Sequence, residues 1–152
     1  MITGVLVIGY GNVLRTDDGL GWHVAERLTQ DPRFEGVAVL QRHQLAPELA
    51  LDVSEAALVV LIDASGSLAP GQLAVNRVER ATIADSTWSH HLEPSVLVAL
   101  AHELYGRAAE VFVVSCGVES VEAGERPSPV VEAAMPAVVE AVFGIVAGLA
   151  VS

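Results

Sequence analysis

Carboxylates and histidines are the side chains in this sequence whose types and positions suit chemistry. Asp18 lies in a paired-aspartate segment after a glycine turn, and Asp63 directly follows an apolar run. His90 and His91 form an adjacent pair before a leucine-rich segment. Two carboxylates and one imidazole suit a borderline divalent metal and leave positions open for water or substrate. We expect Asp18, Asp63 and one of the two histidines to form such a site.

Each of these residues also has a structural explanation. Asp17 occupies a position typical of a helix cap, because acidic side chains accept N–H bonds at helix N-termini. Asp18 differs, since its neighbours Gly19 and Gly21 leave the backbone open for a close partner. Asp63 could cap the following turn, but a carboxylate that ends a buried strand is often functional. Adjacent histidines point in different directions, so only one of the pair would enter a shared site.

Apolar runs and helical spacing predict the elements that position these residues. We expect strands at 5–8, 37–40, 58–62, 73–78 and 111–114, and helices at 17–30, 46–54, 94–106 and from 129 onward. Pro136 lies inside the apolar pattern of the last helix, so we expect a kink or a break there.

Strands that alternate with helices predict a single α/β domain over residues 1–152, built as a doubly wound sheet with helices on both faces. In such sheets, ligands bind beyond the carboxyl ends of the strands. Three of the apolar runs end at Gly9, Asp63 and Ser115. We therefore expect these three positions to surround one crevice.

Composition argues against several classes of function. The net charge is −11, and the eight basic residues are scattered arginines, whereas a nucleic-acid surface needs clustered basic residues. No uninterrupted apolar run reaches the roughly 18 residues of a membrane span, so we expect no membrane insertion. The single cysteine, Cys116, cannot form an internal disulfide, which fits a reducing cytoplasm.

The glycine turn also invites a nucleotide-binding interpretation, which fails on two counts. Gly9 and Gly11 match the first two glycines of the dinucleotide motif G-x-G-x-x-G, but Leu14 occupies the third position. The paired aspartates nearby would repel a pyrophosphate. The turn therefore indicates a site for a cation rather than for a nucleotide.

Residues 9–21, GYGNVLRTDDGLG, closely resemble the G-x-G-N-x-L-x-x-D-[DE]-G-x-G signature of the hydrogenase maturation proteases. These endopeptidases process the large subunit of nickel–iron hydrogenases. The resemblance continues through residues 61–64 (LIDA), 89–92 (SHHL) and 117–119 (GVE), and it covers nearly the whole chain. It implies a three-layer αβα sandwich of the phosphorylase/hydrolase-like kind, with a twisted, mostly parallel central sheet.

The resemblance also implies roles for individual residues. The acidic metal ligand of the family falls on Asp18, its strand-end aspartate on Asp63 and its histidine on His90, with His91 as a register alternative. These three residues would form the catalytic centre and bind nickel that the substrate itself supplies. Asp17 would play a supporting or capping role, and the glycine turn would bring backbone N–H groups close to the substrate chain.

The implied reaction removes a C-terminal peptide from the nickel-loaded precursor of a hydrogenase large subunit. A cytoplasmic monomer that meets one large partner is the expected form. Two alternatives use the same features. A non-catalytic nickel-binding maturation factor would use the same ligands without cutting a chain. A peptidyl-tRNA-hydrolase-like enzyme has a similar G-x-G-N turn, but it would need basic residues for RNA, and the charge of −11 argues against it.

Overall fold

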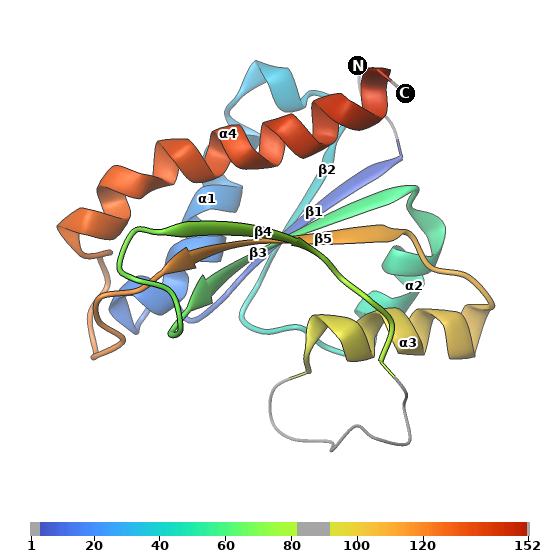
Figure 1. The fold of residues 1–152 in the computed structure, drawn as a ribbon, viewed down its shortest axis with the longest axis horizontal. Helices are drawn as coiled ribbons and strands as arrows, with labels where there is room; N and C mark the ends of the chain where they lie inside the picture. The colour runs from blue at the N-terminus through green and yellow to red at the C-terminus, as the bar shows by residue number, and fades with distance from the viewer. Residues whose placement is uncertain (1–3, 82–91, 152) are drawn as a thin grey trace.

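The structure is a computed structural model that describes residues 4–81 and 92–151. In this part of the chain, five strands form one sheet in the order β2-β1-β3-β5-β4 (Figure 1). The strands are β1 (Val5–Tyr10), β2 (Ala38–Arg42), β3 (Leu58–Ser65), β4 (Leu73–Arg77) and β5 (Glu110–Gly117). Only the edge strand β4 pairs antiparallel among these five, so the sheet is mostly parallel, as predicted.

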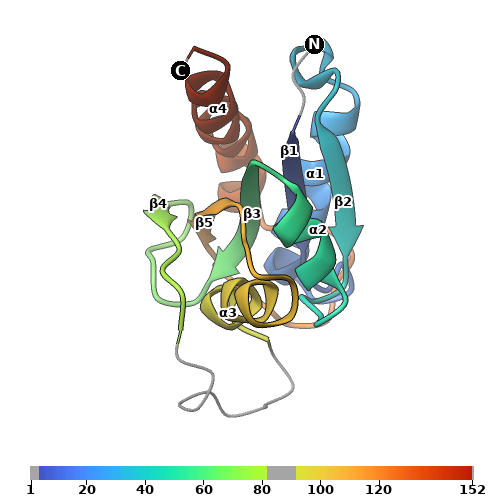
Figure 2. The same cartoon turned by 90° about the vertical axis from the view of Figure 1, so that its right-hand side faces the viewer.

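Helices cover both faces of the sheet and complete three layers. They are α1 (Leu20–Thr29), α2 (Leu49–Glu55), α3 (Pro94–Tyr105) and α4 (Pro129–Val151), with short 3-10 helices η1 (Thr16–Gly19) and η2 (Pro32–Phe34). The core cluster on one face contains residues of α1 and α4, and the cluster on the other contains residues of α2 and α3. Figure 2 shows α2 and α3 beside one another. The predicted αβα architecture is confirmed.

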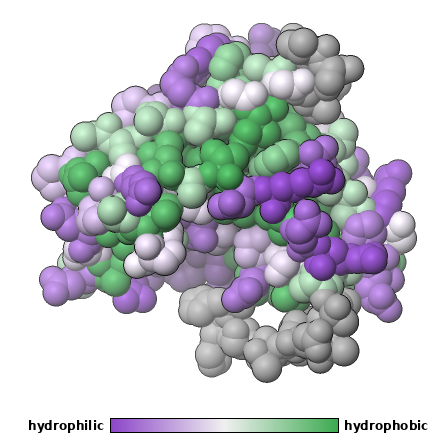
Figure 3. All heavy atoms as spheres, in the orientation of Figure 1, coloured by the Kyte–Doolittle hydropathy of each residue, from purple (hydrophilic) through white to green (hydrophobic). Residues whose placement is uncertain are grey.

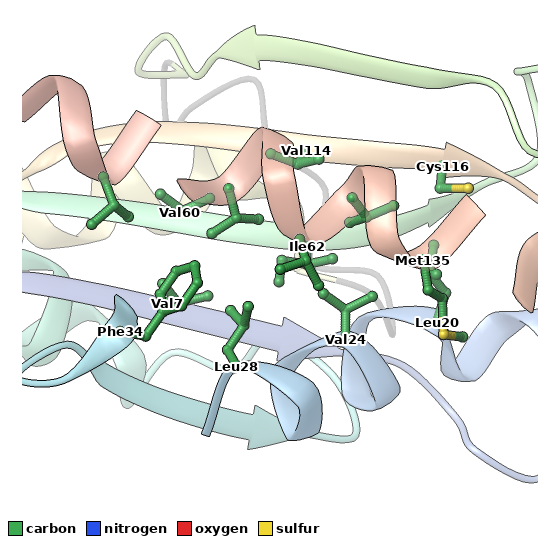
Figure 4. Packing of buried hydrophobic residues seen from close by; sticks show 14 of the residues in the cluster. Val7, Leu20, Val24, Leu28, Phe34, Val60, Ile62, Val114, Cys116 and Met135 are labelled. Carbon is green, nitrogen blue, oxygen red and sulfur yellow. The ribbon is translucent and has the colours of Figure 1, made fainter. Parts of the chain in front are cut away.

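The two core clusters follow from alternation along the buried strands. On β3, Val60 and Ile62 face α1 and α4, whereas Val59 and Leu61 face α2 and α3. A strand covered on both faces needs apolar residues at every position, which explains the uninterrupted run in the sequence. Figure 4 shows the α1 and α4 side of this packing. The carboxyl ends of the strands are thereby held rigidly at one edge of the core.

We expected a kink or a break at Pro136, and the break is wrong, because helix α4 is continuous from Pro129 to Val151 (Figure 1). A proline inside a helix removes one backbone hydrogen bond and crowds the preceding turn, at a cost of about 3 kcal/mol. Met135 and Val138, on either side of the proline in the sequence, are buried against the sheet. Their packing holds the helix together where local propensity would end it.

Helix α4 also contains a segment, Pro129–Gly148, that is long and apolar enough to cross a membrane by length and composition alone. Glu132 and Glu140 interrupt it, so it is not one uninterrupted apolar run. In the folded chain, its buried side chains belong to the core and contact β5 and α1. On the face shown in Figure 3, apolar atoms gather over α4 and β4, where Val130 and Val75 are partly exposed.

The proline inside α4 gives a prediction about stability. Pro136 is exposed, so Pro136→Ala restores a backbone donor and improves helix propensity without disturbing the core. We expect the free energy of unfolding to rise by about 2 kcal/mol, measured by urea denaturation. Ala133→Gly, at an exposed position of the same helix, should instead lower it by about 1 kcal/mol. An unchanged or lowered stability of Pro136→Ala would show that α4 does not accommodate the proline under strain.

Candidate functional site

A cavity of about 310 Å³ opens at the carboxyl ends of β1, β2 and β3. Asp18 and Asp63 both line it, so the structure brings together two of the residues that the sequence singled out. The other lining residues come from the end of β1, from the turns after β1 and β2, and from the start of α3: Tyr10, Gly11, Asn12, Arg15, His43, Gln44, Leu45, Leu92, Glu93 and Pro94.

The expected crevice among Gly9, Asp63 and Ser115 is only partly correct. Asp63 lines the cavity, whereas Gly9 packs under α1, where a Cβ atom would collide with the carbonyl oxygen of Gly21. Ser115 pairs with Asp63 in the sheet but does not line the cavity. The loop after β5 is bound to η1 instead, so the site is formed on the β1 and β2 side of Asp63.

His90 and His91 lie outside the described residues, and the prediction that one of them joins the site stays a prediction. The described chain resumes at Leu92, which lines the cavity together with Glu93 and Pro94. Within residues 4–81 and 92–151, no group of three or more His, Cys, Asp or Glu side chains is arranged to hold a metal ion. The described residues therefore provide two carboxylates of the predicted set.

The turn after β1 holds Asp18 at the cavity. The N–H of Asn12 donates a hydrogen bond of 3.0 Å to Oδ2 of Asp18. Gly11 has φ +147°, and a Cβ atom there would collide with the carbonyl oxygen of Asp18, so only glycine fits. The Gly11 N–H donates to the carbonyl oxygen of Arg42 at 3.1 Å. Both N–H groups are used within the fold, so neither is free to donate to a substrate chain. The expectation that the turn lies close to the substrate chain stays a prediction.

Asp63 lies next to a tyrosine that the sequence analysis missed. Tyr10 and Asp63 come from neighbouring strands, and the Tyr10 hydroxyl donates a hydrogen bond to the Asp63 carboxylate. Burial raises the pKa of Asp63, the hydrogen bond from Tyr10 opposes this rise, and the negative charge of Asp18 adds to it; the resulting pKa is about 6. Burial and the Asp63 charge raise the pKa of Tyr10, so the hydroxyl remains a donor.

The two carboxylates make the cavity attractive to a cation. Asp18 is close enough to Asp63 for its negative charge to add to the effect of burial on the pKa of Asp63, as expected between like charges in a partly buried site. A bound divalent cation reverses this effect, because it favours the ionised form of both groups. Arg15 also lines the cavity and supplies a fixed positive charge there.

Asp17 has a different role from its neighbour, because its side chain is completely buried. Its carboxylate accepts hydrogen bonds from the N–H groups of Glu119 (2.9 Å), Ser120 (3.1 Å) and Ser128 (2.7 Å) and from the Ser128 hydroxyl (2.8 Å). All of these donors lie outside η1 and α1. The prediction that Asp17 caps its own helix is wrong: it ties the loop between β5 and α4 to η1.

Hydrogen bonding decides the ionisation of this buried group. Burial alone would raise the pKa of Asp17, but the hydrogen bonds from Ser128, Glu119 and Ser120 outweigh that effect and hold the pKa below its ordinary value. Asp17 is therefore ionised at neutral pH. A buried carboxylate with this many donors is stabilised by its hydrogen bonds rather than by a counter-charge.

Thr16 forms the turn that places the two neighbouring aspartates in different surroundings. Its φ of +49° lies in the left-handed region, which is uncommon for a β-branched residue. Its N–H donates to the carbonyl oxygen of Gly124 (2.9 Å), and its hydroxyl donates to that of Glu122 (2.6 Å). These bonds maintain a turn after which Asp17 is buried in the core and Asp18 lies at the cavity.

Sequence reasoning missed Tyr10, Arg15 and His43 as cavity residues. His43 directly follows β2, which ends at Arg42 rather than at residue 40 as predicted. With the correct strand end, the rule that ligands bind beyond strand termini would have pointed to His43. Arg15 had no signal beyond its place within the glycine–aspartate motif.

Comparison with known proteins gives a consistent result. Residues 22–145 match the family model HycI, described as hydrogenase maturation protease. The hydrogenase maturating endopeptidase HybD from E. coli superposes with a TM-score of 0.74 at 25% identity, covering 95% of this chain and 92% of that one. The hydrogenase 2 maturation peptidase from Thaumarchaeota archaeon SCGC_AB-539-E09 gives 0.71 at 25%, covering 94% and 97%.

A third solved structure, the [NiFe] hydrogenase maturation protease HycI from Thermococcus kodakarensis KOD1, has a TM-score of 0.70. It is 21% identical, with 93% of this chain and 91% of that one covered, and it shows the shared fold. No curated protein sequence matches the chain.

The hydrogen bonds of Asp17 predict a large loss of stability on substitution. Asp17→Asn removes the charge and turns a donor group toward backbone N–H donors. We expect the free energy of unfolding at pH 7 to fall by about 3 kcal/mol in urea denaturation. Asp52→Asn, at an exposed position on α2, is the matched control and should change little. Equal stability of the two variants would contradict the role given to Asp17.

The raised pKa of Asp63 predicts a pH-dependent loss of folding stability. Between its ordinary value of 3.8 and about 6, the folded chain binds a proton that the unfolded chain has released, so stability falls as pH rises through this range. Two units correspond to about 3 kcal/mol. We expect Asp63→Asn to be more stable than the native chain at pH 7, by up to about 3 kcal/mol, and equally stable at pH 4. A stability difference that does not vary with pH would contradict the raised pKa.

Proposed function

This chain belongs to the hydrogenase maturation protease family, and on that premise we propose that it removes a C-terminal peptide from the nickel-loaded precursor of a nickel–iron hydrogenase large subunit. Its solved relatives at 25% identity are a hydrogenase maturating endopeptidase and a hydrogenase 2 maturation peptidase, and the chain is a peptidase. The observation that carries the finer proposal is the meeting of Asp18 and Asp63 in one cavity at the strand ends.

We propose that nickel enters this cavity as part of the substrate, and that Asp18, Asp63 and His90, or His91 in its place, bind it. Carboxylate and imidazole groups are suitable ligands for a borderline divalent ion such as nickel. Burial, and to a smaller extent the charge of Asp18, raise the pKa of Asp63, and a cation between the two carboxylates would offset both effects. A precursor without nickel would leave both effects in place, so it would bind less tightly.

The side chains around the cavity have distinct tasks in the proposed reaction. The bound nickel supplies a Lewis acid that polarises a carbonyl group or a water molecule. The Asn12 N–H orients Asp18, and the Tyr10 hydroxyl orients Asp63. Binding to the cation keeps Asp63 ionised, and its carboxylate can accept the proton that an attacking water releases. Arg15 provides a positive charge on the cavity wall for the oxyanion that forms at the cleaved carbonyl.

The proposed partner is the large-subunit precursor alone, met by a monomer of this chain in the cytoplasm. Nickel insertion and peptide removal would occur there before the hydrogenase is complete. Cys116 is a free, buried cysteine, and a reduced thiol of this kind is compatible with a reducing compartment.

The direct test is cleavage of purified precursor, prepared with and without nickel and followed by mass spectrometry. We expect release of a C-terminal peptide from the nickel-loaded form only. Asp18→Asn and Asp63→Asn should lower the cleavage rate at least 100-fold, as is common when a positioned acid–base group is removed, whereas the exposed control Asp52→Asn should not.

Three outcomes would contradict the proposal: cleavage of both forms, cleavage of neither, or unchanged cleavage by the two cavity variants. Tight nickel binding without peptide release would instead support a non-catalytic nickel-binding maturation factor.

A further inference from the structure

A second hollow, of about 340 Å³, lies beside the candidate active site. It is lined by Val13, Leu14, Trp22, His23, Glu26 and Glu125. Leu14 is 60% exposed. Val13, Leu14 and Trp22 together give the hollow an apolar part, with Glu26 and Glu125 beside it. A contiguous apolar patch with a polar rim indicates a surface that binds another chain.

The exposure of Leu14 is built into the fold. Its N–H donates to Oδ1 of Asn12 at 2.9 Å, and its carbonyl oxygen accepts from the N–H of Gly124 at 2.9 Å. The neighbouring Arg15 and Gly124 form a parallel bridge. Both backbone polar groups of Leu14 are thus paired, and its side chain is presented from a fixed position at little further cost in conformational entropy.

One short segment separates the hollow from the active-site cavity. Asn12 and Arg15 line the cavity, whereas Val13 and Leu14, which lie between them in the sequence, line the hollow. A polypeptide that crosses this segment can therefore occupy both sites at once. Such a second contact holds the substrate without taking part in the chemistry.

The rim of the hollow is negative. Glu26 and Glu125 both line it, and no arginine is among the described residues that do so. Arg27, the nearest arginine in sequence to Glu26, is instead paired with Glu132 at 2.5 Å. Burial lowers the pKa of His23, so its imidazole is neutral at pH 7 and does not offset the two carboxylates.

We propose that this hollow binds an apolar side chain of the precursor protein that has a lysine or arginine close to it in sequence. The apolar side chain contacts Leu14, Val13 and Trp22, and the cation contacts the carboxylates of Glu26 and Glu125. This inference rests on the proposed function, because it assigns the hollow to the same substrate. It adds a recognition element that is independent of nickel.

The test separates KM from kcat for cleavage of the nickel-loaded precursor. Leu14→Glu adds a charge of the same sign as the rim and removes the apolar contact, so we expect KM to rise about tenfold or more while kcat is unchanged. Leu14→Ser, which adds no charge, should raise KM by a smaller factor. Leu104→Glu is the matched control, because Leu104 is 59% exposed on α3 and lines neither site. Its KM should equal that of the native chain.

The charge part of the proposal has its own measurement. The KM of the native chain should rise with salt, because ions screen the attraction between the rim and the cation of the precursor. In Glu26→Gln/Glu125→Gln, KM should already be raised at low salt and should depend less on salt. If KM of this double variant depends on salt as strongly as KM of the native chain, the hollow does not bind a basic residue of the precursor.

Failure of this inference is distinguishable from failure of the proposed function. If the native chain cleaves no precursor, the proposed function is wrong, and the assignment of the hollow to this substrate is then wrong as well. If the native chain cleaves the precursor and Leu14→Glu has a native KM, the hollow is not a docking site and the proposed function stands. A fall in kcat at native KM would also overturn the inference, since it would place Leu14 in the chemistry.

Discussion

The hydrogen bonds that the buried, ionised carboxylate of Asp17 accepts from the loop between β5 and α4 hold the two sides of the site together. The carboxylate accepts them from residues more than 100 positions away in the sequence, and so it fixes that loop against η1. With the loop in place, Gly124 pairs with the segment that carries Leu14 and Thr16. The turn at Thr16 then leaves the adjacent Asp18 at the cavity. One buried group thus shapes both the active-site wall and the neighbouring hollow.

Asp18 and Asp63 are arranged for function at a cost to stability. Asp63 lies near the end of a buried strand, beside a second carboxylate and without a paired cation in the described part of the chain, and its pKa is raised to about 6. A carboxylate kept in such surroundings weakens the folded state at neutral pH, and a neutral side chain would remove that cost. This loss of stability suits a site that binds a metal ion carried by its substrate, because the bound ion relieves the repulsion between the two carboxylates.

Sequence patterns predicted the sheet, its covering helices and the two carboxylates, because burial on both faces and ligand binding at strand ends are local or topological rules. They could not predict the partners of Asp17, since Glu119 and Ser128 reach it only through tertiary folding. The break expected at Pro136 does not occur because core packing of α4 outweighs the local effect of the proline. His43 was missed because β2 extends two residues beyond the predicted strand end. In each case long-range contacts decided a feature that local propensity could not.

If Asp18 and Asp63 together bind the nickel of the substrate, X-ray absorption at the nickel edge will detect their oxygen atoms as new ligands. The spectrum of nickel-loaded precursor would be recorded alone, with the native chain, and with the Asp18→Asn/Asp63→Asn double variant. We expect the native chain to add oxygen ligands to the nickel and the double variant to add none. A nickel spectrum that is the same in all three samples would show that Asp18 and Asp63 do not bind the nickel.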